Sequence, residues 1–236
     1  MNVLALETGS EWCSVAVGDG ARWAVRSLHA GQLHSERIMP MVDAALAEAG
    51  VALRDLDGIA FGAGPGAFTG VRIACGVAQG LSFGAGVPAV PVSTLAALSE
   101  VARRVHGWAN VFAALDARMG EVYVATHRFG ANGCEELSPP AVLPPSEVSL
   151  PVAARAAGGE PWFGAGGGFA VYPELASRLG LAHADATLRP DAQAIGALAL
   201  PILRGGGGVA AAFALPIYVR DRVALTTAER AAGAHL

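Results

Sequence analysis

The stretch Phe61-Gly-Ala-Gly-Pro-Gly-Ala-Phe-Thr-Gly-Val-Arg-Ile73 places glycines and a proline where a strand is expected to pass into a helix. A glycine-rich turn at a helix N-terminus can bind phosphate, because backbone N–H groups and the helix dipole point at the anion. The same glycines can instead form a tight turn that sets the angle of the helix. All 16 basic residues are arginine, so the lysine of a P-loop is missing, and we favour the tight turn.

Other chemistry-bearing patterns in the sequence are weak. Gly80-Leu-Ser-Phe-Gly84 matches the nucleophile elbow of serine hydrolases, but it lies inside a predicted helix rather than between a strand and a helix. The 6 histidines show no His-Glu-x-x-His pattern, and the 3 cysteines lie far apart, which argues against a metal site. The sequence therefore contains no complete catalytic motif.

The composition of the chain argues against several classes of protein. Hydrophobic residues make up 53% of the chain and charged residues 15%, which argues against disorder. No charge occurs between Ile73 and Ser99, but glycines and prolines divide this stretch into a helix, a turn and a strand, which argues against a membrane span. No signal-peptide pattern is present, so we expect a cytoplasmic protein without a membrane partner. A net charge of −4 without a basic run argues against tight autonomous binding of nucleic acid.

The hydrophobic patterning predicts the elements that position these residues. The first part of the chain reads as strand, strand, strand, helix, strand, helix, strand and helix, with the strands over 2–7, 12–17, 22–28, 57–62 and 89–92 and the helices over about 34–49, 69–84 and 94–105. This order completes one α/β lobe. Two strands end at an acid, Leu4-Ala-Leu-Glu7 and Ala113-Ala-Leu-Asp116, and each is followed by a strand of alternating pattern. The separation between the acid and the following strand is the same in both, which suggests a repeat. We therefore predict two lobes, over 1–108 and 109–236.

The second predicted lobe is smaller and loopier than the first. We expect a proline-rich connection and a poorly determined helix over 138–151, a helix after Gly168, a helix over 191–203 and an extended end over 216–220.

A regular glycine pattern marks the second predicted helix. Gly76, Gly80 and Gly84 recur every four residues and so lie along one face. Glycine weakens a helix by about 1 kcal/mol relative to alanine, which suggests that this face has a close packing partner. That partner is either the lobe's own sheet or neighbouring helix, or another chain.

Several segments together resemble the TsaB (YeaZ) family, whose members support threonylcarbamoyladenosine synthesis on tRNA. They are Leu4-Ala-Leu-Glu-Thr8, His34-Ser-Glu-Arg-Ile-Met-Pro-Met41, Gly64-Pro-Gly-Ala-Phe-Thr-Gly-Val-Arg-Ile73, Val92-Ser-Thr-Leu95, Leu115-Asp-Ala-Arg-Met-Gly-Glu-Val-Tyr123 and Pro216-Ile-Tyr-Val-Arg220. The resemblance covers the N-terminal half densely and the rest thinly. It implies a two-lobed, actin-like (sugar-kinase-like) ATPase fold of the α/β class, in which each lobe is a mixed β-sheet with flanking helices.

The resemblance also implies where a nucleotide would bind in active relatives. An acid at the end of each lobe's first strand faces metal and phosphates there, and glycines of the second lobe hold adenosine. Glu7, followed by Thr8, and Asp116 occupy the acid positions, and Gly166 and Gly167 could imitate the adenosine loop. Arg118 and Met119 put bulky side chains where active relatives have glycines, so we expect at most a vestigial site.

The catalytic paralogue TsaD carries a His-x-x-x-His metal pair directly after the strand equivalent to 89–92. This chain has Ser93-Thr-Leu-Ala-Ala-Leu98 there, without a histidine. The resemblance therefore implies no metal or catalytic residues in this chain and no cofactor of its own, with ATP entering a complex mainly through partner subunits.

The function implied is that of a non-catalytic subunit, which is not an enzyme by itself. It would bind a TsaD-type catalytic paralogue and a TsaE-type ATPase, form a homodimer when alone, and contact tRNA only indirectly. The expected interface residues lie on the helices at about 34–49 and 69–84: Ile38, Met41, Val42, Ala45, Arg72, Ile73, Gly76, Val77, Gly80 and Gly84. The alternatives are an independent nucleotide-binding ATPase or phosphotransferase of the same fold, based on Glu7 and Asp116, and a metallopeptidase.

Overall fold

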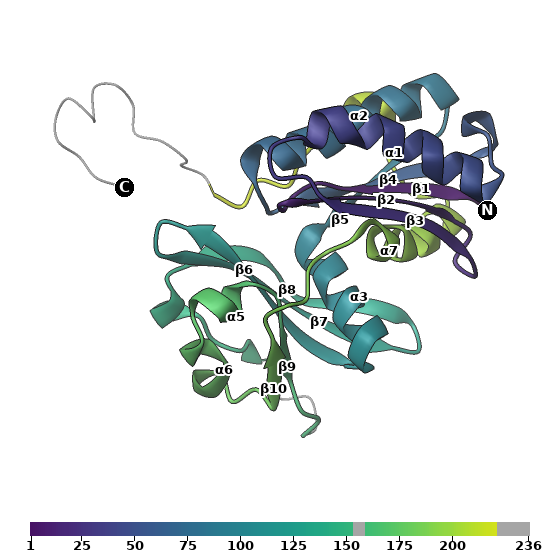
Figure 1. Ribbon diagram of the computed structural model, residues 1–236. Helices are drawn as coiled ribbons and strands as arrows, with labels where there is room; N and C mark the ends of the chain where they lie inside the picture. Colours follow the sequence, from purple (N-terminus) through teal and green to yellow (C-terminus); the bar gives the residue numbers. More distant parts are fainter. Residues whose placement is uncertain (153–158, 221–236) are drawn as a thin grey trace, which may run out of the picture.

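The computed structural model describes residues 1–152 and 159–220, which form two mixed sheets of five strands each (Figure 1). The strand order is β3-β2-β1-β4-β5 in the first sheet and β8-β7-β6-β9-β10 in the second. Each sheet is thus an antiparallel meander of three strands continued by two parallel strands. The same topology occurs twice, so the chain has the two-lobed actin-like fold, and the predicted repeat is confirmed.

The strands of the first sheet are β1 (Val3–Glu7), β2 (Trp12–Gly18), β3 (Trp23–His29), β4 (Gly58–Gly64) and β5 (Ala89–Ser93). Those of the second sheet are β6 (Asn110–Arg118), β7 (Glu121–Gly130), β8 (Gly133–Leu143), β9 (Phe163–Ala165) and β10 (His183–Asp185). The helices are α1 (His34–Ala49), α2 (Phe68–Ala85), α3 (Thr94–His106), α5 (Gly168–Val171), α6 (Glu174–Arg178) and α7 (Ala192–Arg204), and short 3-10 turns are η1 (Leu53–Asp55), η2 (Pro145–Glu147) and η3 (Ala211–Phe213). The helices predicted over about 34–49 and 69–84 are α1 and α2.

The first sheet lies between two layers of helices. α1 and α2 cover one face, and α7 covers the other (Figure 1). α1 ends because Gly50 takes the left-handed conformation, with φ of 65°, and its N–H bonds the carbonyls of Ala47 and Leu46. α2 ends in the same way at Gly86, with φ of 69°. These two glycine caps set the lengths of the two helices on this face.

The last helix of each predicted lobe packs on the sheet of the other lobe. α3 buries Leu95 and Leu98 against the second sheet. α7 buries Ile195 and Leu200 against the first sheet, in a cluster that includes Val3. The sequence prediction assigned residues 109–236 to the second lobe, and the structure differs for α7; residues 153–158 and 221–236 of that range lie outside the described part.

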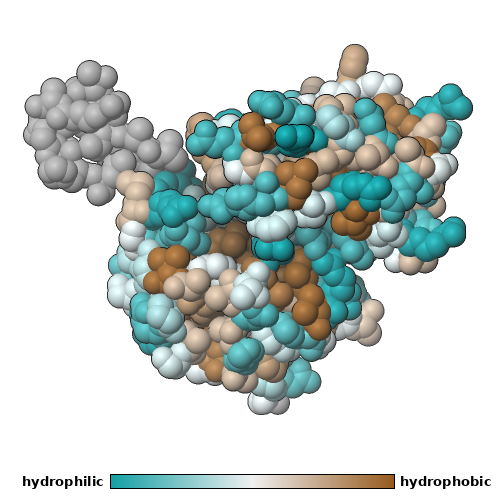
Figure 2. All heavy atoms as spheres, viewed as in Figure 1, coloured by the Kyte–Doolittle hydropathy of each residue, from teal (hydrophilic) through white to brown (hydrophobic). Residues whose placement is uncertain are grey.

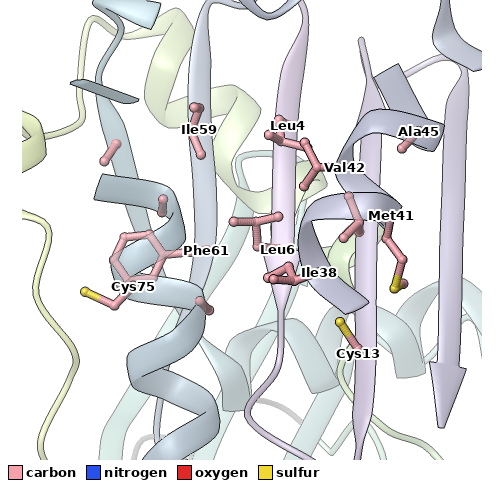
Figure 3. Close-up of a cluster of buried hydrophobic side chains, with 14 of the residues drawn as sticks. Leu4, Leu6, Cys13, Ile38, Met41, Val42, Ala45, Ile59, Phe61 and Cys75 are labelled. Carbon is pink, nitrogen blue, oxygen red and sulfur yellow. The ribbon is translucent and has the colours of Figure 1, made fainter. Parts of the chain in front are cut away.

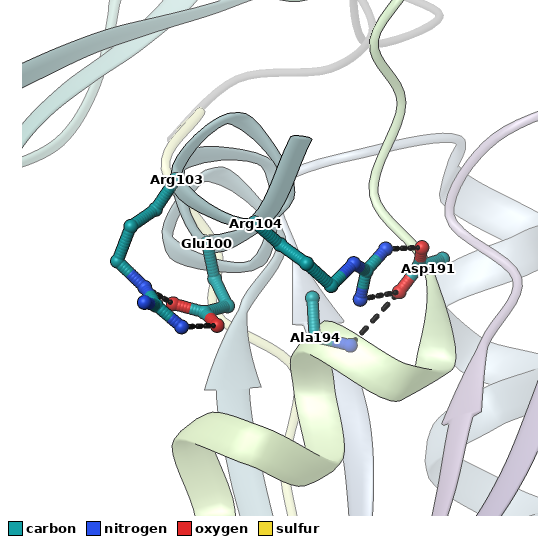
Figure 4. Close-up of polar contacts among 5 residues, drawn as sticks. All are labelled: Glu100, Arg103, Arg104, Asp191 and Ala194. Carbon is teal, nitrogen blue, oxygen red and sulfur yellow. Dashed lines mark hydrogen bonds and ion pairs between the residues drawn. The ribbon is translucent and has the colours of Figure 1, made fainter. Parts of the chain in front are cut away.

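Two local features hold α7 in this place. A Cβ at Gly196 would lie 2.4 Å from the ring of Trp23, so only glycine lets the helix approach β3 this closely. Asp191 caps α7 by accepting from the Ala194 N–H at 2.8 Å, and it also accepts a two-pronged hydrogen bond from Arg104 of α3 (Figure 4). The sequence pattern identified the helix but not the sheet that its apolar face covers.

The second lobe differs from the prediction in two segments. Residues expected to form a connection after Ser138 continue β8 to Leu143. Pro139 and Pro140 are tolerated because β8 is an edge strand, with β7 as its only neighbour in the sheet. The single helix expected after Gly168 is instead two short ones, α5 and α6, with Pro173 between them.

Leu200 tests the packing of α7 on the first sheet. Its side chain is 2% exposed, so Leu200→Ala leaves a cavity, and we expect the free energy of unfolding to fall by about 2–5 kcal/mol. Ile202 on the same helix is 43% exposed, and Ile202→Ala is expected to change that free energy by less than about 0.5 kcal/mol. Urea denaturation measures both variants, and equal effects would contradict the packing described.

Candidate functional site

The glycine-rich loop after β4 packs directly on the turn after β1. The Ala67 N–H donates to the Gly9 carbonyl at 2.7 Å, and the Gly64 N–H donates to the Thr94 hydroxyl at 3.2 Å. A Cβ at Gly66 would lie 2.6 Å from the carbonyl oxygen of Gly9. Two N–H groups of the loop are therefore already bonded within the protein, and the loop forms a tight turn against the end of β1.

Thr8 joins this turn to the first residues of α2. Its hydroxyl donates to the Gly70 carbonyl at 2.7 Å, and a Cβ at Gly70 would lie 2.0 Å from the Thr8 carbonyl oxygen. The start of α2 is thus in backbone contact with the end of β1. Thr8 is fully buried and has a structural partner here rather than a free hydroxyl.

Glu7 lies buried beneath the loop. Its side chain is 1% exposed and accepts from the Gly9 N–H at 2.5 Å and from the Thr94 hydroxyl at 3.4 Å. Burial raises the pKa of Glu7 to about 7, and the nearby Asp191 charge acts in the same direction. A Cβ at Gly62 would lie 2.0 Å from a carboxylate oxygen, which leaves no space on that side. Glu7 is enclosed by protein atoms and does not face an open phosphate site.

Asp116 and the second-lobe glycines are also engaged by their own lobe. Asp116 accepts from the Arg118 N–H at 2.9 Å and pairs with the Arg118 guanidinium at 3.1 Å. A Cβ at Gly166 would lie 2.5 Å from the Ala114 carbonyl oxygen, so this glycine serves a close approach to β6. Space at Gly167 is open, since a Cβ there would meet nothing within 4 Å.

These residues do not fit a nucleotide with bound metal as they stand. The first acid is buried, the second is paired with an arginine, and the loop N–H groups named above are bonded internally. The segment 93–98, where the resemblance placed a metal pair in TsaD, is the capped start of α3: the Ser93 hydroxyl accepts from the Ala96 N–H, and Leu95 and Leu98 are buried. Within residues 1–152 and 159–220, no group of three His, Cys, Asp or Glu side chains is arranged to hold a metal ion.

The predicted interface residues of α1 lie on its core face. Val42 and Ile38 lie beside Leu4 and Leu6 of β1 (Figure 3), and all four predicted residues, Ile38, Met41, Val42 and Ala45, are buried in the same cluster. They therefore do not form a surface for another chain in this structure. The amphipathic pattern identified a buried face correctly, but this face is covered by the chain's own sheet.

The glycines of α2 lie on the exposed side of their helix and not on its core face. Gly76, Gly80 and Gly84 are exposed, and a Cβ at any of them would meet nothing within 4 Å. Among residues 1–152 and 159–220, nothing therefore packs on this stripe within the lobe. Phe83, next to the stripe, is 84% exposed. We call these four residues the α2 face.

The predicted residues Arg72, Ile73 and Val77 border the α2 face. Ile73 and Val77 are partly buried against the core of the first lobe. Arg72 lies over the ring of Phe68, at 3.3 Å from its centroid, and donates to the Tyr218 hydroxyl at 2.9 Å. Figure 2 shows hydrophobic areas that interrupt the hydrophilic surface of this lobe.

The segment around Phe213 and Ala214, which runs beside α2, was not predicted as part of this surface. Ala214 is buried, and its carbonyl accepts from the Gln79 amide at 2.7 Å and from the Cys75 thiol at 3.2 Å. Phe213 is 71% exposed beside it. The polar side chain of Gln79 on a glycine-rich helix was the one signal in the sequence, and it does not specify its partner.

No helix within the described residues is long and apolar enough to cross a membrane; this includes α2, in which Arg72 is the one charged residue.

Comparison with known proteins relates the chain to a group involved in tRNA modification. The family model described as TsaD, tRNA N6-adenosine threonylcarbamoyltransferase, matches residues 28–223. The chain is 39% identical over 228 residues to the tRNA threonylcarbamoyladenosine biosynthesis protein TsaB of Escherichia coli (strain K12), covering 95% of this chain and 96% of that protein. It is 48% identical over 124 residues to the protein of the same name from Haemophilus influenzae, covering 52% of each.

A solved structure agrees with these sequence comparisons. YeaZ from Pseudomonas aeruginosa superposes with a TM-score of 0.85 at 43% identity, covering 92% of this chain and 99% of that one. The similarity thus extends over both lobes and not only over the glycine-rich loop.

Glu7 predicts a specific pH dependence of stability. Between the ordinary carboxyl pKa of 4.5 and the folded value of about 7, the folded state keeps a proton that the unfolded state releases. Stability therefore falls as the pH rises through this window, by roughly 3 kcal/mol at 1.36 kcal/mol per pKa unit, and stays lowered above it. Glu7→Gln is expected to remove this loss of stability at high pH. Denaturation at pH 5 and pH 8 measures the difference in the free energy of unfolding for both proteins. Glu135→Gln, at an exposed position of β8, is the control and should leave it unchanged.

Proposed function

The chain belongs to the TsaB family, and from that membership we propose that it is a non-catalytic subunit for threonylcarbamoyladenosine synthesis on tRNA. It would bind a TsaD-type catalytic paralogue through the α2 face and support transfer of the threonylcarbamoyl group to the adenosine next to the anticodon. The observation that carries this proposal is the open glycine stripe of Gly76, Gly80 and Gly84, where a Cβ would meet no atom of the described residues within 4 Å.

The α2 face has the properties of a helix-packing surface. Glycines without side chains let a second backbone come close, and the close packing of two helices offsets the low helix propensity of glycine. The exposed Phe83 supplies an aromatic side chain of the kind that anchors protein interfaces. On the neighbouring α1 we propose Met39, which is 40% exposed, as the interface residue in place of the buried residues predicted from the sequence.

The proposal assigns catalysis to the partner. Glu7 is enclosed and Asp116 is paired with Arg118, so neither is free for phosphate chemistry as arranged here. We propose that a TsaE-type ATPase and the TsaD-type subunit contribute the nucleotide and metal chemistry in the cytoplasm. tRNA would contact this chain indirectly, in keeping with its net charge of −4. When no paralogue is present, the same face would pair with a second copy.

Gly80→Leu tests the α2 face. The new side chain enters open space, so we expect the isolated chain to stay folded, with stability unchanged or raised by up to about 1 kcal/mol. The leucine would block close approach of a partner helix, and copurification with TsaD is expected to fall at least about tenfold. Ala170→Leu adds a similar side chain at an exposed position of α5 and should leave binding unchanged. Undiminished binding by Gly80→Leu would contradict the assignment of the interface.

Reconstitution tests the function itself. Modification of tRNA by purified TsaD, TsaE and the enzyme that makes the threonylcarbamoyl donor is measured with and without this chain. We expect the modification to require it. Full activity in its absence, or hydrolysis of ATP by the isolated chain with magnesium, would favour the independent ATPase instead.

A further inference from the structure

The segment 209–220 runs along one side of the first lobe. Val209 pairs with Ala89 at the edge of the first sheet through two backbone hydrogen bonds of 2.9 and 2.8 Å. The Ala214 carbonyl is then held by Gln79 and Cys75 of α2. The Ile217 N–H donates to the Ala63 carbonyl at 2.7 Å, beside the glycine-rich loop. These hydrogen bonds attach the segment to β5, α2 and β4.

The same segment then reaches the second lobe. The Arg220 guanidinium donates to the Ala117 carbonyl at 3.0 Å and to the Glu121 carboxylate at 2.5 Å. It also contacts the sulfur of Met119 at 2.9 Å. The Arg220 side chain is 13% exposed, so these charge-assisted contacts are sheltered from solvent. All three partners lie at the β6–β7 turn, directly after Asp116.

The two attachment points lie on different lobes. Ile217 is against the first lobe, where a Cβ at Gly64 would lie 3.2 Å from the Ile217 carbonyl oxygen. Arg220, three residues on, is against the second lobe. In Figure 1 this yellow segment passes on the left of the molecule, away from α3 and α7. It therefore connects the lobes where neither of those helices does.

We propose that the segment 214–220 is a tie that fixes the separation of the two lobes, with Arg220 as its anchor. Two-lobed proteins commonly open and close about a hinge. A short extended chain bonded to both lobes opposes such opening, because residues 217 and 220 cannot move far apart without breaking one attachment. Arg220 is thus a positioning residue: it holds the β6–β7 turn against the first lobe.

The tie also lies next to the α2 face. Tyr218 is held by Arg72 of α2 and lies two residues before Arg220. The hydrogen bond between Arg72 and Tyr218 therefore places the start of α2 only two residues of chain from the Arg220 anchor.

Arg220→Ala in the full chain tests the tie by hydrogen exchange. The Ile217 N–H, bonded to Ala63, is the reporter, and we expect it to exchange at least about tenfold faster in the variant, the loss expected for a charge-assisted hydrogen bond. Glu121→Ala removes one of the three Arg220 contacts and should give a smaller acceleration, and the double variant should exchange no faster than Arg220→Ala because it loses no further contact. Arg54→Ala, at an exposed position of η1, is the control.

A distance measurement completes the test. Spin labels on the exposed Cys134 of β8 and on Asp43→Cys of α1 report the separation of the lobes. The tie predicts a single narrow distance distribution that broadens toward longer distances in Arg220→Ala. An unchanged distribution together with unchanged Ile217 exchange would overturn the proposal. Faster exchange spread evenly over both sheets would also overturn it, since that result shows a general loss of stability.

Discussion

The backbone contact between the end of β1 and the start of α2 determines much of this structure. A Cβ at Gly70 would lie 2.0 Å from the Thr8 carbonyl oxygen, and one at Gly66 would lie 2.6 Å from that of Gly9. Because the two chain segments touch without side chains between them, the direction of α2 is set by the turn after β1. The same contact encloses Glu7, and it leaves the other side of α2 to solvent.

This contact explains why acidic and glycine-rich positions typical of a nucleotide site coexist with a geometry that does not fit one. The loop N–H groups of Gly64 and Ala67 have protein acceptors, and Glu7 has lost the hydration that an ionised carboxylate needs. Under the proposed function, the surface for a partner is the exposed side of α2 rather than the space between the lobes. A two-lobed fold can serve association when its central acids are enclosed.

Much of the fold could be predicted from the sequence, because the repeat of strand patterns after Glu7 and Asp116 follows from periodicity along the chain. Contacts between distant segments could not be predicted in this way. The pattern of Ile38, Met41 and Val42 shows that one face of α1 is buried, but burial by a sheet and burial by a partner leave the same pattern. The glycine stripe of α2 proved to be exposed, since only the structure shows that no other part of the described chain covers it. The partners of Arg220 likewise leave no trace in sequence spacing.

The exchange of α3 and α7 between the lobes bears on how the protein is made. β1 lies near the start of the chain, yet the apolar side chains of Val3 and Ala5 are covered by α7, near residue 200. A nascent chain emerges from the ribosome over seconds, so one face of the first sheet stays bare while almost two hundred residues are synthesised. The core of the first lobe is therefore complete only after α7 has been synthesised, which is later than the strands of the second sheet.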